Sequence, residues 1–123
     1  MGKHALKFGK KLDEDEHIKS KCDNFKAIMQ KDGNFVLYKG DHSTWASNTC
    51  GKGEGPFRLE MQEDGNLVVY EGNGNPTWAS NTCGKGEGKH KLIMQEDGNL
   101  VVYAKCGNGP ENREAIWATG TNE

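Results

Sequence analysis

The sequence predicts an all-β protein assembled from three similar antiparallel hairpin units. The segment MQEDGNLVVY occurs at Met61–Tyr70 and again, unchanged, at Met94–Tyr103. A close variant, MQKDGNFVLY, occupies Met29–Tyr38. Repetition at a period of about 20–50 residues indicates a fold built from repeated supersecondary units. The 123 residues are therefore predicted to form one domain, residues 1–123, with three internal repeats.

Each copy has the sequence features of a β-hairpin. Asp-Gly-Asn separates two arms with alternating apolar residues, and glycine supplies the positive φ of a tight turn. The hairpins are predicted near residues 24–39, 57–71 and 89–104. Because side chains alternate between the faces of a strand, one apolar face results per hairpin. The residues predicted to face inward are Phe25, Ala27, Met29, Phe35 and Leu37; Phe57, Leu59, Met61, Leu67 and Val69; and Leu92, Met94, Leu100 and Val102.

The opposite face of each hairpin carries the pattern Q-x-D-x-N-x-V-x-Y. Turn chemistry explains the Asp and Gly, and for a single copy exposed polar residues are an adequate alternative. That alternative does not explain why Gln, Asn and Tyr recur at fixed offsets, so three intact copies favour a binding face. The candidate residues are Gln30, Asp32, Asn34, Val36 and Tyr38; Gln62, Asp64, Asn66, Val68 and Tyr70; and Gln95, Asp97, Asn99, Val101 and Tyr103.

The chemistry of this face suits a sugar. Sugar hydroxyls donate and accept hydrogen bonds, and so match amides, a carboxylate acceptor and a phenol. The valine is expected to cover the C–H patch of a pyranose ring. The pattern contains no nucleophile with its base and no metal cage, so we expect binding without catalysis and without a cofactor.

The triplicate pattern, followed by W-A-S-N-T or W-A-T-G-T, closely resembles the monocot mannose-binding lectins, the snowdrop or bulb-type family. The resemblance extends from about Leu6 to Thr121. It implies the β-prism II fold, in which three four-stranded antiparallel sheets surround a pseudo-threefold axis. It also implies that each motif is a mannose pocket, in which Asp and Asn bond O2, Gln bonds O3, Tyr bonds O4 and Val lies against the ring.

The first 24 residues are the least repetitive. Leu6, Gly9 and Leu12 fit the opening L-x-x-G-x-x-L of the family, and Asp15 stands where a further glycine is usual. An amphipathic helix over residues 10–21 is the competing interpretation. Short strands are preferred because the prism needs them, and the acidic run 13–16 then forms a solvated turn.

One tryptophan follows each hairpin, at Trp45, Trp78 and Trp117. We expect these three indoles to pack together in the core along the pseudo-threefold axis, rather than to stack on sugar. The glycine-rich segments 50–55 and 83–88 are connectors, since no phosphate-binding signature follows them. From Tyr103 to Trp117 the third repeat is longer than the others, which predicts an inserted loop near residues 106–113.

Cysteine pairing is open. Four cysteines allow three pairings, and the family's usual bridge is excluded because Gly33 occupies its position next to Asp32. Cys22 with Cys50, and Cys83 with Cys106, are the suggested pairs. In the family the last strand is often exchanged between two chains, so a homodimer through this strand is a further expectation.

Composition excludes several classes of function. A formal net charge of −2 argues against nucleic-acid binding, and no apolar run could span a membrane. The N-terminus lacks the apolar segment of a signal peptide, so the chain is expected to act inside the cell, to leave by another route, or to be a mature chain. Metal-ligand spacings are absent.

The sequence therefore predicts a mannose-binding lectin that recognises α-D-mannose and high-mannose glycans through three sites. The alternative is a protein-interaction module on the same scaffold, with the motifs retained for folding. An enzyme is disfavoured, because no repeat pairs an acid with a base.

Overall fold

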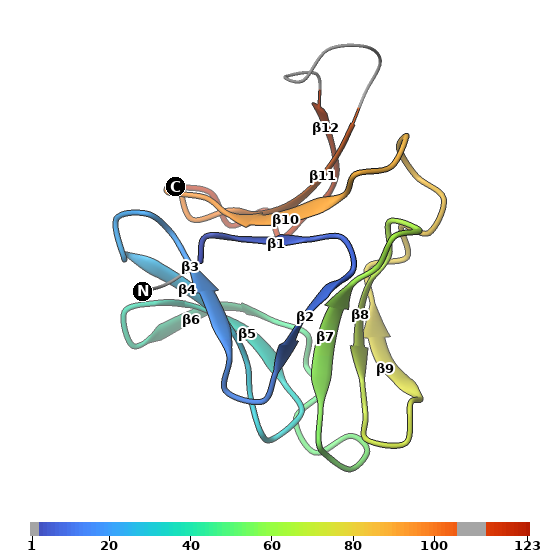
Figure 1. Cartoon of the computed structure of the whole chain (residues 1–123). Coiled ribbons are helices and arrows are strands. Elements are labelled where there is room, and N and C mark those ends of the chain that lie inside the picture. The colour runs from blue at the N-terminus through green and yellow to red at the C-terminus, as the bar shows by residue number, and fades with distance from the viewer. Residues whose placement is uncertain (1–2, 106–112) are drawn as a thin grey trace.

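The computed structural model describes residues 3–105 and 113–123, which form twelve strands in three antiparallel sheets. The sheets form the sides of a three-sided prism (Figure 1). This arrangement confirms the predicted all-β architecture of three four-stranded sheets. The strands are β1 (Ala5–Lys7), β2 (Lys10–Asp13), β3 (His17–Lys19), β4 (Phe25–Met29), β5 (Phe35–Lys39), β6 (His42–Ala46), β7 (Arg58–Met61), β8 (Leu67–Tyr70), β9 (Pro76–Ala79), β10 (Lys91–Met94), β11 (Leu100–Lys105) and β12 (Arg113–Ala118).

Each repeat supplies three adjacent strands of one sheet. The strand orders are β3-β4-β5-β6, β2-β7-β8-β9 and β1-β10-β11-β12. The two hairpin strands are central, and the tryptophan-bearing strand is one edge. The other edge is a short N-terminal strand, which places β1, β2 and β3 in three different sheets (Figure 1).

The N-terminal segment is strand, and the alternative of a helix over residues 10–21 is wrong. Leu6, Leu12 and Ile18 are 3%, 4% and 0% exposed, each on a strand that completes a different sheet. A single helix could not place these side chains in three different sheets. Asp15 adopts φ +67°, the left-handed conformation that glycine usually supplies and that Asp tolerates.

The acidic turn is solvated, with one contact that sequence analysis missed. Lys11 pairs with Asp13 at 3.3 Å and Lys31 with Asp15 at 3.5 Å, all on exposed side chains. Glu14, however, accepts a hydrogen bond from the backbone N–H of Phe57 at 2.9 Å. The turn between β2 and β3 therefore also fixes the start of the second repeat.

The buried core confirms which side chains of the three hairpins were predicted to face inward. Every residue predicted to face inward belongs to one continuous buried cluster, together with the three N-terminal apolar residues. Burial of apolar side chains contributes about 25 cal/mol per Å². One face per sheet is thus enough to hold the prism together, although hydrophobic residues are only 33% of the chain.

The three tryptophans pack against one another. The ring centroids of Trp45, Trp78 and Trp117 are 5.5 Å apart in every pair, with interplanar angles of 69–76°. Edge-to-face pairs of this kind are favourable because the positive ring edge meets the negative face. The indoles are partly buried and pack on the main core cluster, so they join the three sheets as predicted.

The last strand, β12, pairs with β11 of the same chain. The predicted exchange of this strand between two chains therefore stays a prediction. The predicted loop insertion lies almost entirely outside the described residues. The described part of the chain contains no helix whose length and apolar character would let it cross a bilayer.

Candidate functional site

Each candidate site is built on the three-residue turn of its hairpin. In repeat 1 the carbonyl of Gln30 accepts from the N–H of Gly33 at 3.2 Å, and the N–H of Gln30 donates to the carbonyl of Asn34 at 3.0 Å. Asp32 Oδ1 accepts from the Asn34 N–H at 2.9 Å, which closes an Asx turn. Repeats 2 and 3 reproduce all three bonds. Local sequence therefore orients the carboxylate identically three times.

The glycine of each turn lies against a ring from a different repeat. Gly33, Gly65 and Gly98 have φ of +91°, +94° and +92°, and a Cβ on any of them would lie within about 3 Å of that ring. The rings are Phe57, His90 and Phe25, respectively. Each turn thus rests on a neighbouring repeat in cyclic order, an arrangement that sequence analysis missed.

His90 is the exception among these three rings, and replacing it should stabilise the protein. It is 2% exposed, and its Nδ1 atom has no partner within the described part of the chain. An unsatisfied buried polar atom costs about 1–3 kcal/mol. His90→Phe copies the other repeats and should raise the free energy of unfolding by about 1 kcal/mol. Its part-buried Nε2 contact with the Lys85 carbonyl at 2.6 Å is lost, which keeps the expected gain at the low end of that range.

Urea denaturation measures this effect, with Phe57→His as the mirror substitution. Phe57 is 5% exposed under the turn of repeat 1, so a histidine there should lower the free energy of unfolding. Destabilisation by His90→Phe would show instead that the bond to Lys85 outweighs the unpaired Nδ1.

The asparagine of each site is held through its carbonyl oxygen. Asn34 Oδ1 accepts from Ser47 Oγ at 3.2 Å and from the Thr49 N–H at 3.1 Å. The Thr49 hydroxyl in turn donates to the Gly33 carbonyl at 2.6 Å. Since the carbonyl is occupied, the amide NH2 is left to donate outward. Sequence analysis overlooked the positioning residues, although the recurring S-N-T and T-G-T segments mark them. They are Ser47, Thr49, Ser80, Thr82, Thr119 and Thr121.

The glutamine and tyrosine of each site contact each other. Gln30 and the Tyr38 hydroxyl lie 2.7 Å apart, and with its carbonyl toward Tyr38 the amide also donates to Asp32 at 3.2 Å. Gln95 lies 2.5 Å from the Tyr103 hydroxyl, and Gln62 bonds Tyr70. The glutamine and tyrosine are therefore brought together in every repeat, and in repeat 1 the aspartate joins them.

A β-bulge directs each site tyrosine. The register shifts immediately before Tyr38, Tyr70 and Tyr103, where the tryptophan-bearing strand carries one extra residue. In repeat 1, Leu37 pairs with Trp45 and Tyr38 with Ser43, so Thr44 is the extra residue. Bulges re-aim side chains locally. The same bulge at the same place keeps the indole inward and the phenol outward in all three sheets.

The valines correct one prediction. Val36, Val68 and Val101 were expected to cover the C–H patch of a pyranose ring, which needs exposed apolar surface, yet they are 3%, 3% and 2% exposed. They lie on the outer face, but neighbouring strands cover them; Val36, for example, is flanked by Ile28 and Ala46 in register. Each valine therefore lies beneath the polar side chains of the site and has almost no solvent-exposed surface of its own.

The cysteines also differ from expectation. Cys22 and Cys50 are free and exposed, so the suggested bridge between them is absent; the suggested partner of Cys83, Cys106, lies outside the described residues. Cys50 Sγ lies 3.4 Å from Asp32 Oδ2, and Cys83 Sγ lies 3.4 Å from Asp64 Oδ2. These hydrogen bonds raise the pKa of both thiols. A thiol therefore lies next to the site carboxylate in repeats 1 and 2.

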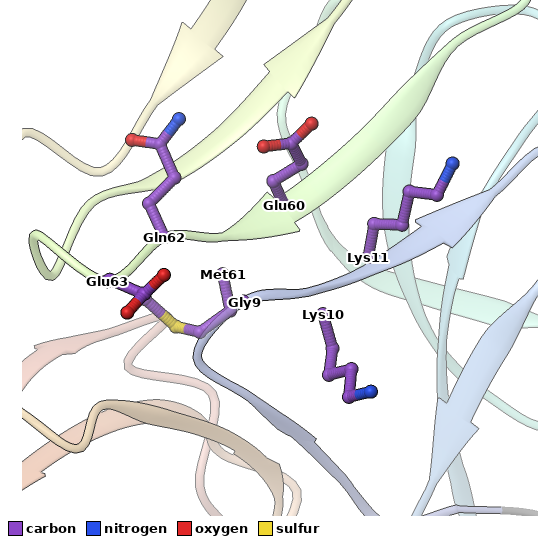
Figure 2. Close-up of a pocket in the computed structure, with 7 residues that line it drawn as sticks. All are labelled: Gly9, Lys10, Lys11, Glu60, Met61, Gln62 and Glu63. Atoms are coloured by element: carbon purple, nitrogen blue, oxygen red, sulfur yellow. The ribbon is translucent and has the colours of Figure 1, made fainter.

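One surface hollow adjoins a candidate site. It has a volume of about 440 Å³ and is lined by Gly9, Lys10, Lys11, Glu60, Met61, Gln62 and Glu63. In Figure 2 the side chain of Gln62 lies beside that of Glu60, both on the β7 side of the hollow. Opposite charges line it, so it selects no particular ion. Within residues 3–105 and 113–123, no group of three acidic, histidine or cysteine side chains could hold a metal.

Comparison with known structures shows relatives over the whole fold. Monomeric monocot mannose-binding lectins of Gastrodia elata are 41% identical, with a TM-score of 0.83, and the match covers 98% of this chain and 99% of theirs. The mannose-specific agglutinin of snowdrop, Galanthus nivalis, solved with methyl α-D-mannoside, is 41% identical with a TM-score of 0.76, and 98% of each chain is covered. A lectin of Marasmius oreades is 30% identical with a TM-score of 0.82, covering 97% and 92%.

Two further comparisons are more limited. Comitin of Dictyostelium discoideum is 48% identical over 46 residues, which are 32% of this chain and 25% of comitin. No model of a protein family matches the sequence.

The fold and these relatives together define a non-enzymatic lectin with the β-prism II architecture. More narrowly, the chain belongs to the monocot mannose-binding, or bulb-type, lectin family, because it matches members at 41% identity over nearly their full length.

Proposed function

We propose that each of the three sites binds one terminal α-D-mannose residue. The observation that carries this proposal is the same set of polar groups, held by the same hydrogen bonds, in three repeats. A relative 41% identical was solved with methyl α-D-mannoside. In this proposal Asp accepts from, and the NH2 of Asn donates to, one hydroxyl of the sugar, O2 of mannose. Gln and Tyr, already in contact, would share O3 and O4.

Each proposed site is shallow, so one site should bind a monosaccharide only at about the millimolar level, or roughly 4 kcal/mol. Useful affinity then requires several sites to engage mannose-rich glycans displayed close together, which raises avidity through effective concentration. The three sites lie on three different sheets of the prism. High-mannose glycans, which present several terminal mannoses, are therefore the proposed natural ligand class.

A sugar titration tests this proposal. Methyl α-D-mannoside, α-D-glucoside and α-D-galactoside are added separately while backbone amides are followed by NMR. We expect mannoside alone to shift the amides of the three Asp-Gly-Asn turns, at Gly33, Gly65 and Gly98. The absence of any shift at tens of millimolar mannoside would contradict mannose binding and favour the protein-interaction alternative.

A further inference from the structure

A basic side chain flanks the tyrosine of every site. Lys26 is the register partner of Tyr38, Arg58 of Tyr70 and Lys91 of Tyr103. Directly opposed residues on one face of an antiparallel pair have Cβ atoms about 4.5–5.5 Å apart. Each cation therefore lies next to the phenol, on the binding face. The three sites differ in how far this charge is neutralised.

In repeat 2 the charge is largely neutralised. Arg58 lies over the Tyr70 ring at 4.6 Å and forms an ion pair with Glu60 at 2.6 Å. On the side away from Tyr70, the register partner of Arg58 is the acidic residue Asp13 on β2. In repeat 1 neutralisation is partial: Lys26 makes no ion pair within the described residues, but its register neighbour Lys19 pairs with Asp23 at 3.0 Å.

Repeat 3 has no such neutralisation. Lys7 on β1 is the register partner of Lys91 on β10. On the other side of Tyr103, β12 carries Ala115 opposite the tyrosine and Arg113 two residues earlier, opposite Lys105. Within the described residues, Lys7, Lys91 and Arg113 make no ion pair with a carboxylate.

The charges of repeat 3 act on one another. Partial burial lowers the pKa of Lys91, and the positive charges of Arg113 and Lys7 lower it further. Like charges opposed across strands destabilise a sheet, so folding alone does not account for this cluster. The acidic residue that follows Arg113 in sequence, Glu114, pairs in register with the buried Ala104, so it alternates to the opposite face from Arg113.

The position of this cluster relative to the sugar follows from the proposed function, on which this inference rests. If Tyr103 bonds O4, the next ring carbon, C5, carries the C6 hydroxymethyl group on the tyrosine side of the site. A substituent on O6 then falls beside Lys91, whereas a substituent on C1 lies across the ring. A phosphate monoester carries about −1.5 to −2 charges at pH 7, and arginine and lysine are its usual protein partners.

We propose that the site of repeat 3 prefers mannosides that carry a phosphate on O6, with Lys91, Lys7 and Arg113 as the residues that determine this preference. The site of repeat 2, where Arg58 is paired with Glu60, lacks the preference. The site of repeat 1, where Lys26 stands without the second and third cation of repeat 3, shows a weaker preference.

The test compares four ligands on the full chain by NMR, at low and moderate salt. These are methyl α-D-mannoside, its 6-phosphate, α-D-mannose 1-phosphate and inorganic phosphate. At the amides of Gly98 and Asn99 we expect the 6-phosphate to bind about 10-fold more tightly than the neutral mannoside, the effect of one added charge-assisted hydrogen bond. At Gly65 and Asn66 the two should agree within about 2-fold. Added salt should reduce the preference.

A variant and its control sharpen the result. Lys91→Met should bring the affinity ratio of 6-phosphate to neutral mannoside at repeat 3 close to one. Lys52→Met, an exposed lysine of the first connector, should leave that ratio unchanged. Equal binding of the two ligands by the parent protein would overturn the inference while leaving mannose binding intact.

Three other outcomes separate the remaining possibilities. Equally tight binding of the 1-phosphate would overturn the placement of O6 beside Lys91. Inorganic phosphate that matched the 6-phosphate would reveal an anion site independent of sugar. Failure of neutral mannoside at every repeat would contradict the proposed function itself.

Discussion

Trp78→Ala should lower the free energy of unfolding by about 3 kcal/mol, the low end of the usual cost of truncating a large aromatic in a core, because the indole is partly buried. The indole contacts Trp45 and Trp117 at 5.5 Å, and each edge-to-face pair is worth about 0.5–1.5 kcal/mol beyond area burial. The three rings come from three sheets, so the cavity opens where the sheets meet. Native domains have only about 5–15 kcal/mol of stability, and the variant should therefore unfold at much lower urea concentration.

The matched control is Phe8→Ala. Phe8 is also aromatic, but it is 40% exposed, so its truncation should cost far less than that of Trp78. Both variants are compared with the parent by urea denaturation followed by far-UV circular dichroism. Equal losses for the two variants would show that the tryptophan cluster does not join the sheets energetically.

Asp64→Asn should weaken mannoside binding at repeat 2 by more than about 10-fold while leaving repeats 1 and 3 unchanged. A hydrogen bond to a charged group contributes about 1.5–3 kcal/mol, and the substitution removes the charge. The fold should survive, because an asparagine Oδ1 still accepts from the Asn66 N–H, as Asn73 does from Asn75 at 3.0 Å in another turn of the same repeat.

Site-resolved NMR titration with methyl α-D-mannoside measures this loss, since each repeat has its own Asp-Gly-Asn amides. Asp41→Asn removes the same charge in the exposed turn between β5 and β6 and should leave all three affinities within about 2-fold of the parent. Parental affinity in Asp64→Asn would mean that the carboxylate is not the acceptor for the sugar.

Much of the fold could be predicted because the deciding information is local. Asp-Gly-Asn sets the turn, and the turn sets the register of its hairpin. The alternation of Leu59 and Met61 with polar residues then decides which face is buried. The spacing of Leu6, Leu12 and Ile18 marks three short strands, although assigning them to strands depended on family resemblance rather than on periodicity.

The details of the site were less predictable. Alternation placed Val68 on the outer face correctly, but strand parity says nothing of how neighbouring strands cover a side chain, and the valine is 3% exposed. The thiol of Cys50 meets Asp32 rather than Cys22, because the chain returns to its own turn after β6. Such contacts join residues far apart in the sequence, so no local pattern encodes them.

The sequence by itself determined the three hairpins, their inward faces and the polar groups that recur on the outer faces, because all of these depend on turn chemistry and a period of two residues. Only the tertiary structure decided that each turn rests on a ring from another repeat, that a bulge directs each tyrosine, and that Lys7, Lys91 and Arg113 gather beside Tyr103. These features arise where separate strands and sheets meet, and the energies of those contacts depend on positions in space that spacing along the chain does not specify.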